Sequence, residues 1–139
     1  MTAPIRSSVL ALVGASLLTL ATPLAAGAHS AKGPTYLYDC STVVQRPSQI
    51  TISCADADRL VKAITWSSWS GRSAHARGTL EWNTCTPTCA AGATKTKVIT
   101  FTATDRKEVK GRWLYTELKG PRGAWGAKSK VFHLPTAPL

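Results

Sequence analysis

The stretch Ala74-His75-Ala76-Arg77-Gly78-Thr79-Leu80-Glu81-Trp82, AHARGTLEW, alternates small or apolar residues with polar or charged ones. Successive side chains of a β-strand point to opposite faces of a sheet. This period of two therefore places Ala76, Gly78, Leu80 and Trp82 on one face. A helix would instead bring apolar residues together every three or four positions. The stretch predicts a β-strand with one apolar face and one polar face.

Other parts of the chain share this strand character. They are residues 49–54, 60–69, 98–103, 112–118 and 128–134. Gly, Pro, Asp and Asn separate these segments, and Asp105 to Gly111 has the composition of a charged turn. About six or seven short strands of this kind are typical of a small sandwich or barrel. We therefore expect an all-β fold, an antiparallel, disulfide-stapled β-sandwich of the immunoglobulin type, with a small β-barrel as the alternative.

The first 28 residues have the organisation of a secretory signal peptide. Arg6 supplies a positive charge, Val9 to Ala21 form an apolar run, and Ala26 and Ala28 are the small residues of a cleavage site. A membrane-spanning helix is the alternative, but it needs about 20 apolar residues and this run is shorter. We predict cleavage after Ala28 and a single secreted β domain over residues 29–139, outside the cell.

All four cysteines follow the predicted cleavage site: Cys40, Cys54, Cys85 and Cys89. An even number of cysteines in an exported chain predicts disulfide bonds. Of the three possible pairings, Cys40–Cys54 with Cys85–Cys89 requires the least rearrangement of the chain. A zinc site is the alternative, but the spacings are not those of paired CxxC motifs. We expect two disulfides and neither a metal site nor a cofactor.

The chain is basic, and the charge is concentrated in its second half. Between Lys95 and Lys130 there are ten Lys or Arg residues and three acidic ones. Arg6 is the only charged side chain that cleavage after Ala28 would remove, which leaves a net charge of (17 − 1) − 7 = +9. Such charge attracts anionic polymers, and the attraction weakens as salt is added. A solvated surface without a partner is the alternative.

Four of these residues fall on one predicted hairpin tip, and a fifth follows beside Trp125. The candidate binding residues are Arg106, Lys107, Lys110, Arg112 and Arg122. They do not lie on a predicted helix, so we expect no sequence-specific nucleic acid recognition by a recognition helix. The expected partner is an anionic cell-wall polymer or another polyanion.

Motifs that would indicate catalysis are missing from the sequence. It contains no GxSxG and no HExxH, and its cysteines are assigned to disulfides. We therefore expect a non-catalytic, basic binding module rather than an enzyme. The alternative is a secreted enzyme or a protease inhibitor that presents Thr86-Pro87-Thr88 from the loop between Cys85 and Cys89.

Residues 66–70, Trp66-Ser67-Ser68-Trp69-Ser70, match the WSxWS motif of class I cytokine receptors. In those receptors the motif lies close to the end of a fibronectin-type domain, whereas here 69 residues follow Ser70. We interpret the match as a coincidence. Trp66, Trp69 and Trp82 are instead expected to be structural aromatic residues.

The two tryptophans of this motif are three residues apart. On a regular strand their rings would point to opposite faces unless a bulge intervenes. We expect Trp66 in the core near the Cys40–Cys54 bridge and Trp69 at a strand end. Arg72 or Arg77 is a candidate to stack on Trp69.

Five short motifs between residues 40 and 92 occur in a distinctive order. They are RPS at 46–48, CAD at 54–56, ITWSSW at 64–69, AHARG at 74–78 and CTPTCAAG at 85–92. In this order they resemble a group of small secreted actinobacterial proteins of unknown function. The resemblance covers about half of the mature chain. It implies secretion, and because the group has no established activity it assigns no functional residue.

Overall fold

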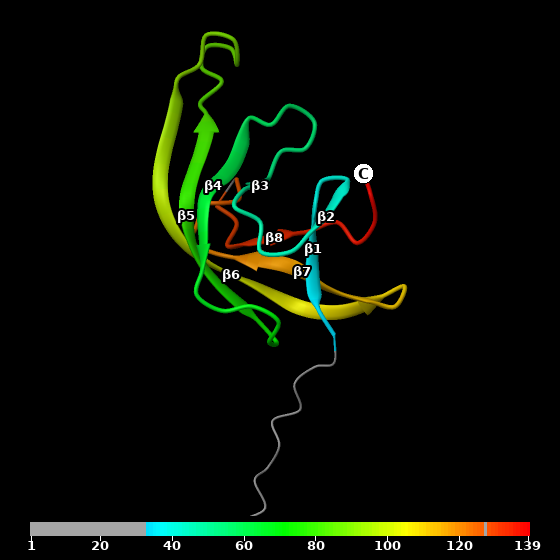
Figure 1. Cartoon of the computed structure of the whole chain (residues 1–139). Helices are drawn as coiled ribbons and strands as arrows, with labels where there is room; N and C mark the ends of the chain where they lie inside the picture. The colour runs from blue at the N-terminus through cyan, green and yellow to red at the C-terminus, as the bar shows by residue number, and fades with distance from the viewer. Residues whose placement is uncertain (1–32, 127) are drawn as a thin grey trace, which may run out of the picture.

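The computed structural model describes residues 33–126 and 128–139, and within them every regular element is a β-strand (Figure 1). The strands are β1 (Thr35–Asp39), β2 (Thr42–Val44), β3 (Ile50–Thr51), β4 (Arg59–Trp66), β5 (Ala74–Asn83), β6 (Thr94–Val109), β7 (Arg112–Lys119) and β8 (Val131–His133). The predicted all-β, disulfide-stapled class is confirmed. In these ranges no helix is present that could cross a membrane. The predicted signal peptide lies outside the described residues.

The strands form a single curled sheet in the order β2-β1-β7-β6-β5-β4-β3, and β8 also pairs with β7. All pairs are antiparallel except β1 with β7, which is parallel. One curled sheet is closer to the small-barrel alternative than to two stacked sheets. The reason is β6, whose 16 residues pair with β5 along one half and with β7 along the other. This long strand bends through the sheet without a break at which a second layer would begin (Figure 1).

The long strand β6 corrects one prediction. Residues 105–109 were expected in a charged turn, but they continue β6, and the turn consists of Lys110 and Gly111. Asp105 has a φ of 53° and is not paired in the ladder with β7. Its carboxylate instead accepts a hydrogen bond of 2.6 Å from the hydroxyl of Thr116. This local bond allows the strand to continue past an irregular residue.

A bulge in β4 sets which of its residues face the core. The pairing of β4 with β5 shifts by one residue between Lys62 and Thr65, and Ala63 has a φ of 50°. Gly78 lies opposite the shift, where an added Cβ would approach Val61 to 2.7 Å. The extra residue brings both Val61 and Ile64 into the core. The glycine is therefore required by the close approach of the bulged strand.

The core occupies the inner face of the curl. Its most buried large side chains include Tyr115, Leu37, Ile50, Leu118 and Val61. The same face carries Ile99, Phe101 and Ala103 at alternating positions of β6. We call this side of the sheet the inner face.

Trp66 and Trp69 do not point to opposite faces. Their rings lie edge to face with centroids 4.4 Å apart, and both pack against the core. Because β4 ends at Trp66, Trp69 belongs to the following loop and is freed from the strand's alternation. The ring of Trp69 also lies edge to face with the ring of Tyr115. The expected stacking on Arg72 or Arg77 is wrong for the described residues.

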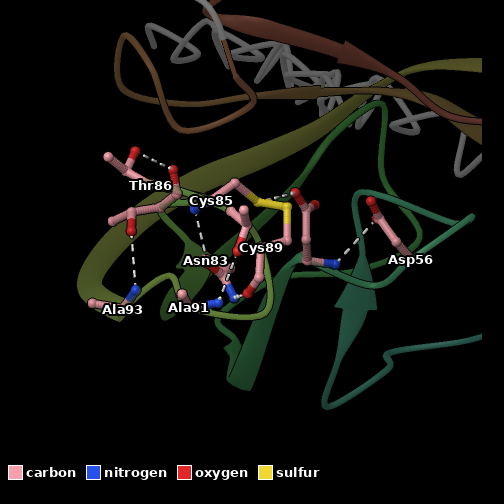
Figure 2. The surroundings of a disulfide bond; sticks show 10 residues. Asp56, Asn83, Cys85, Thr86, Cys89, Ala91 and Ala93 are labelled. Carbon is pink, nitrogen blue, oxygen red and sulfur yellow. Dashed lines mark hydrogen bonds between the residues drawn. A yellow bond between two sulfur atoms is a disulfide. The ribbon is translucent and has the colours of Figure 1, made fainter.

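Both disulfides have the predicted pairing. Cys40–Cys54 connects the end of β1 to the segment after β3, and Cys85–Cys89 closes a short loop after β5 (Figure 2). The described residues contain no free cysteine. The first bond joins the turn between β1 and β2, at one end of the strand order, to the segment after β3, at the other end. The second bond is local, because its cysteines are only 4 positions apart.

Candidate anion-binding surface

The structure brings four of the five predicted binding residues to the β6–β7 hairpin, but it gives most of them partners. The guanidinium carbon of Arg106 lies 4.2 Å from the ring centre of Trp113. Its Nε donates a hydrogen bond of 2.7 Å to the hydroxyl of Thr35. Arg106 therefore joins β6 to β1 and β7, and two of its five N–H donors are used within the fold.

Lys107 and Arg112 also have partners. The Lys107 ammonium is 2.7 Å from the Asp105 carboxylate. Hydrogen bonds from Lys107 and then from Thr116 lower the pKa of Asp105, and the same contact with Asp105 raises the pKa of Lys107. The guanidinium of Arg112 lies over Tyr36 at 5.5 Å. Of the predicted hairpin residues, this leaves Lys110 as an exposed cation at the turn.

Arg122 lies away from the hairpin, in the loop after β7. It lines a pocket of about 260 Å³ together with Arg59 of β4, Lys97 of β6 and Trp82 of β5. Leu80, Ile99 and Ala124, which are all nearly inaccessible, also line it, and we call these three residues its apolar floor. We call this pocket, defined by Arg59, Trp82, Lys97 and Arg122, the inner-face pocket.

Lys97 belongs to the inner face because it is two residues from Ile99 on the same strand. Lys95, two residues further, pairs with Trp82 across the sheet. The inner face of β6 therefore changes from apolar, at Ile99 and Phe101, to cationic at one end. The alternation of Lys95, Lys97, Ile99 and Phe101 in the sequence carries this change, although the surrounding basic residues make it inconspicuous. Arg59 had no local signal, because only strand pairing places it beside Trp82.

Arg59 makes two long contacts within the fold, one with an aromatic ring and one with a backbone carbonyl. Its guanidinium carbon is 5.8 Å from the ring centre of Trp82, its cross-strand neighbour. One Nη donates to the backbone carbonyl of Ala124 at 3.4 Å. Arginine has five N–H donors, so most of its donors remain for a ligand. This arrangement presents a planar cation at the wall of the pocket.

The cations of the pocket have no ion-pair partner in the part of the chain that the structure describes. The carboxylates within 4.0 Å of a described cation belong to Glu81, Asp105 and Glu117, and they contact Lys62, Lys107, Lys119 and His133. In the described ranges no carboxylate forms an ion pair with Arg59, Lys97 or Arg122. A concave site that is lined by positive charges and has apolar walls raises the local concentration of anions. The pocket therefore has the electrostatic character of an anion-binding site.

The tryptophan of the pocket differs from those of the core. The indole N–H groups of Trp66, Trp69 and Trp125 donate to backbone carbonyls of Pro47, Thr35 and Lys130. Trp82 is half-buried, and its indole N–H donates to no residue in the described part of the chain. Buried indole groups usually find an acceptor. Trp82 thus combines a packed ring with an indole N–H that is not used within the described part of the fold.

The Cys85–Cys89 loop is held by its flanking residues (Figure 2). Asn83 accepts a hydrogen bond from the Cys85 N–H at 2.8 Å and donates to the Cys89 carbonyl at 2.9 Å. The Thr84 hydroxyl accepts from the Ala93 N–H at 3.0 Å. These bonds fix the conformation of the loop that the inhibitor alternative requires.

Within residues 33–126 and 128–139, no group of three or more His, Cys, Asp or Glu side chains is placed to hold a metal ion. No protein-family model, curated protein or solved structure matches the chain. The resemblance to secreted actinobacterial proteins therefore stays a prediction.

Proposed function

We propose that this protein is a secreted, non-catalytic module that binds an anionic cell-surface polymer through the inner-face pocket. The observation that supports it best is the convergence of Arg59, Lys97 and Arg122 without a described ion-pair partner. The two disulfides are consistent with an oxidising compartment outside the cytoplasm.

A polymer fits this surface better than an isolated ion because the strand and the loop that supply the pocket carry further cations. Lys95 lies in the next row of the sheet, paired with Trp82. Lys128 and Lys130 are exposed in the loop that also carries Arg122. A chain of regularly spaced anionic groups would contact the pocket and these residues together. Each neutralised charge would add to binding and to its salt dependence.

The hairpin is a weaker contact in this proposal. Arg106, Lys107 and Arg112 already interact with Trp113, Asp105 and Tyr36. An anionic ligand would have to compete with Asp105 for Lys107 and with the Thr35 hydroxyl for the Nε of Arg106. The predicted hairpin residues therefore contribute long-range attraction more than direct binding.

The test is retention of the mature protein on immobilised wall polymer and on heparin over a salt gradient. Substituting the pocket cations (R59Q, K97Q, R122Q) should move elution to clearly lower salt. The control removes three charges from exposed arginines elsewhere (R46Q, R72Q, R77Q) and should move elution much less. Equal shifts for both triple variants, or elution of the wild type near zero salt, would refute the proposal. Stronger retention on DNA than on wall polymer would redirect it to nucleic acid.

A second candidate function is protease inhibition by the Cys85–Cys89 loop. It is favoured by the hydrogen bonds that Asn83 and Thr84 form with the backbone of this region, because an inhibitor loop has to be rigid before it binds. The loop holds only three residues between its cysteines, which is short for insertion into an active site. Absence of inhibition across a panel of secreted serine proteases would remove this candidate.

A further inference from the structure

The inner-face pocket is larger than a bare anion requires, and part of its lining is apolar. Its volume of about 260 Å³ is slightly below the range of about 300–1,000 Å³ found for drug-sized ligands. Leu80, Ile99 and Ala124 are each only 3% exposed and form its floor. An inorganic ion held at the cationic rim would leave this floor without a contact. The pocket therefore suits a ligand that has an uncharged part beside its anionic group.

The cations of the rim indicate which anionic group this is. The planar guanidinium of arginine forms two parallel hydrogen bonds to phosphate, and lysine adds a point charge. Arg59 keeps most of its donors for such a contact beside its two long contacts with Trp82 and the Ala124 carbonyl. Arg122 and Lys97 are exposed and approach the same space from the loop and from β6. This set suits a group with several acceptor oxygens.

Trp82 provides the contact for the uncharged part. Its ring lines the pocket, and its indole N–H has no acceptor among the described residues. A polyol or sugar has both a C–H surface to pack on an indole ring and oxygens to accept its N–H. An aliphatic group would use only the ring.

We propose that the inner-face pocket binds a phosphate ester of a sugar-sized polyol. The phosphate lies on Arg59, Lys97 and Arg122, and the polyol lies on Trp82 and the apolar floor. This inference rests on the proposed function, because it names the repeating unit of the polymer that the module holds.

The test is an NMR titration of the ¹⁵N-labelled mature protein at constant ionic strength, with glucose 6-phosphate, glycerol 1-phosphate, inorganic phosphate and glucose 6-sulfate. The indole signals are assigned with single Trp→Phe variants. The two phosphate esters should shift the Trp82 indole and bind about tenfold or more tightly than inorganic phosphate. Trp113, whose ring lies against Arg106, is the internal control and should not shift. Equal affinity for inorganic phosphate, equal affinity for the sulfate ester, or an unmoved Trp82 would overturn the inference.

Two variants separate the roles of the pocket residues. Arg59→Lys keeps the charge but loses the planar fork, and it should weaken ester binding about tenfold. Trp82→Phe keeps a ring and removes the donor, so it should reduce the preference for esters over inorganic phosphate. A dispersed, folded spectrum of each variant shows that the loss is local. Unchanged ester affinity in folded R59K would contradict the assignment of the phosphate.

The polymer and the ester are tested independently. Retention on wall polymer that depends on the pocket, without ester binding, would overturn this inference and leave the proposed function intact. Loss of both would overturn both. Binding to phosphatidylglycerol vesicles in place of wall polymer would keep the phosphate ester but contradict the polymer as its source.

Discussion

The indole N–H of Trp69 donates a hydrogen bond of 2.9 Å to the backbone carbonyl of Thr35. Thr35 is fully buried in β1, and Trp69 lies in the loop after β4. In the order of the sheet these two strands are separated by β7, β6 and β5. The bond therefore joins segments on opposite sides of the curl. The second tryptophan of the WSSWS motif therefore has a structural role, which is to hold the loop after β4 against β1.

Replacing Trp69 by Phe should destabilise the protein by about 1–3 kcal/mol, because it leaves a buried carbonyl without its donor. Trp82→Phe is the matched control, since that indole N–H has no described acceptor, and its cost should be clearly smaller. Urea unfolding followed by far-UV circular dichroism measures both. A larger loss for Trp82→Phe would contradict the role assigned to Trp69.

Gly78→Ala should cost about 1–3 kcal/mol through overpacking. The new Cβ would lie 2.7 Å from Val61 Cγ1 and 3.1 Å from Ile64 Cγ1. Gly71→Ala is the control, because its Cβ would meet only the backbone oxygen and nitrogen of Ser73, at 3.4 Å and 3.9 Å, and its effect should stay within about 0.5 kcal/mol. Equal midpoints of thermal unfolding for the two variants would show that β4 and β5 do not meet closely at the bulge.

The two disulfides should contribute unequally to stability. Cys40 and Cys54 are 14 positions apart, whereas Cys85 and Cys89 are 4 apart. In the loop-entropy model the longer loop gains about 3 kcal/mol and the shorter about 2 kcal/mol. The C40S/C54S variant should therefore unfold at lower denaturant concentration than C85S/C89S. The reverse order would indicate that the short loop stabilises the native state by another means.

Stability should fall at alkaline pH partly because of Tyr115. Burial raises the pKa of this phenol above its ordinary value of 10.0, although Arg106 opposes the change. The unfolded chain then releases the proton at lower pH than the folded one. The contribution is complete below pH 10 and is lost as pH rises through the folded pKa. Tyr115→Phe should show a shallower decline above pH 10 in urea titrations, and an identical decline would exclude this cause.

The sequence predicts local structure well where a single period dominates. The alternating stretch 74–82 forms most of β5, as predicted. It was predictable because every second residue of this strand faces the core. The pairing of neighbouring cysteines is also confirmed. These features depend on residues close together in the chain.

Features that depend on strand pairing were missed. β1 pairs in parallel with β7, 78 positions further along the chain in the Thr35–Trp113 pair, and nothing in its short sequence indicates this partner. The inner-face pocket forms only when Arg59 and Lys97, from two strands on either side of β5, meet the loop of Arg122. The hairpin residues were adjacent in the sequence and therefore more conspicuous. Their engagement with Asp105 and Trp113 became visible only in three dimensions.

The central claim concerns Arg59, Lys97 and Arg122 of the inner-face pocket, which have no ion-pair partner among the described residues. The most direct measurement is the dependence of the polymer-binding constant on salt concentration, for the wild type, the pocket variant (R59Q, K97Q, R122Q) and the control (R46Q, R72Q, R77Q). Each neutralised phosphate contributes about 0.7–0.9 to the slope of log K against log salt. The pocket variant should lose about 2–3 from this slope, and the control less than about 1. Equal slopes for the two variants would show that the protein responds to net charge alone, and would contradict a defined site.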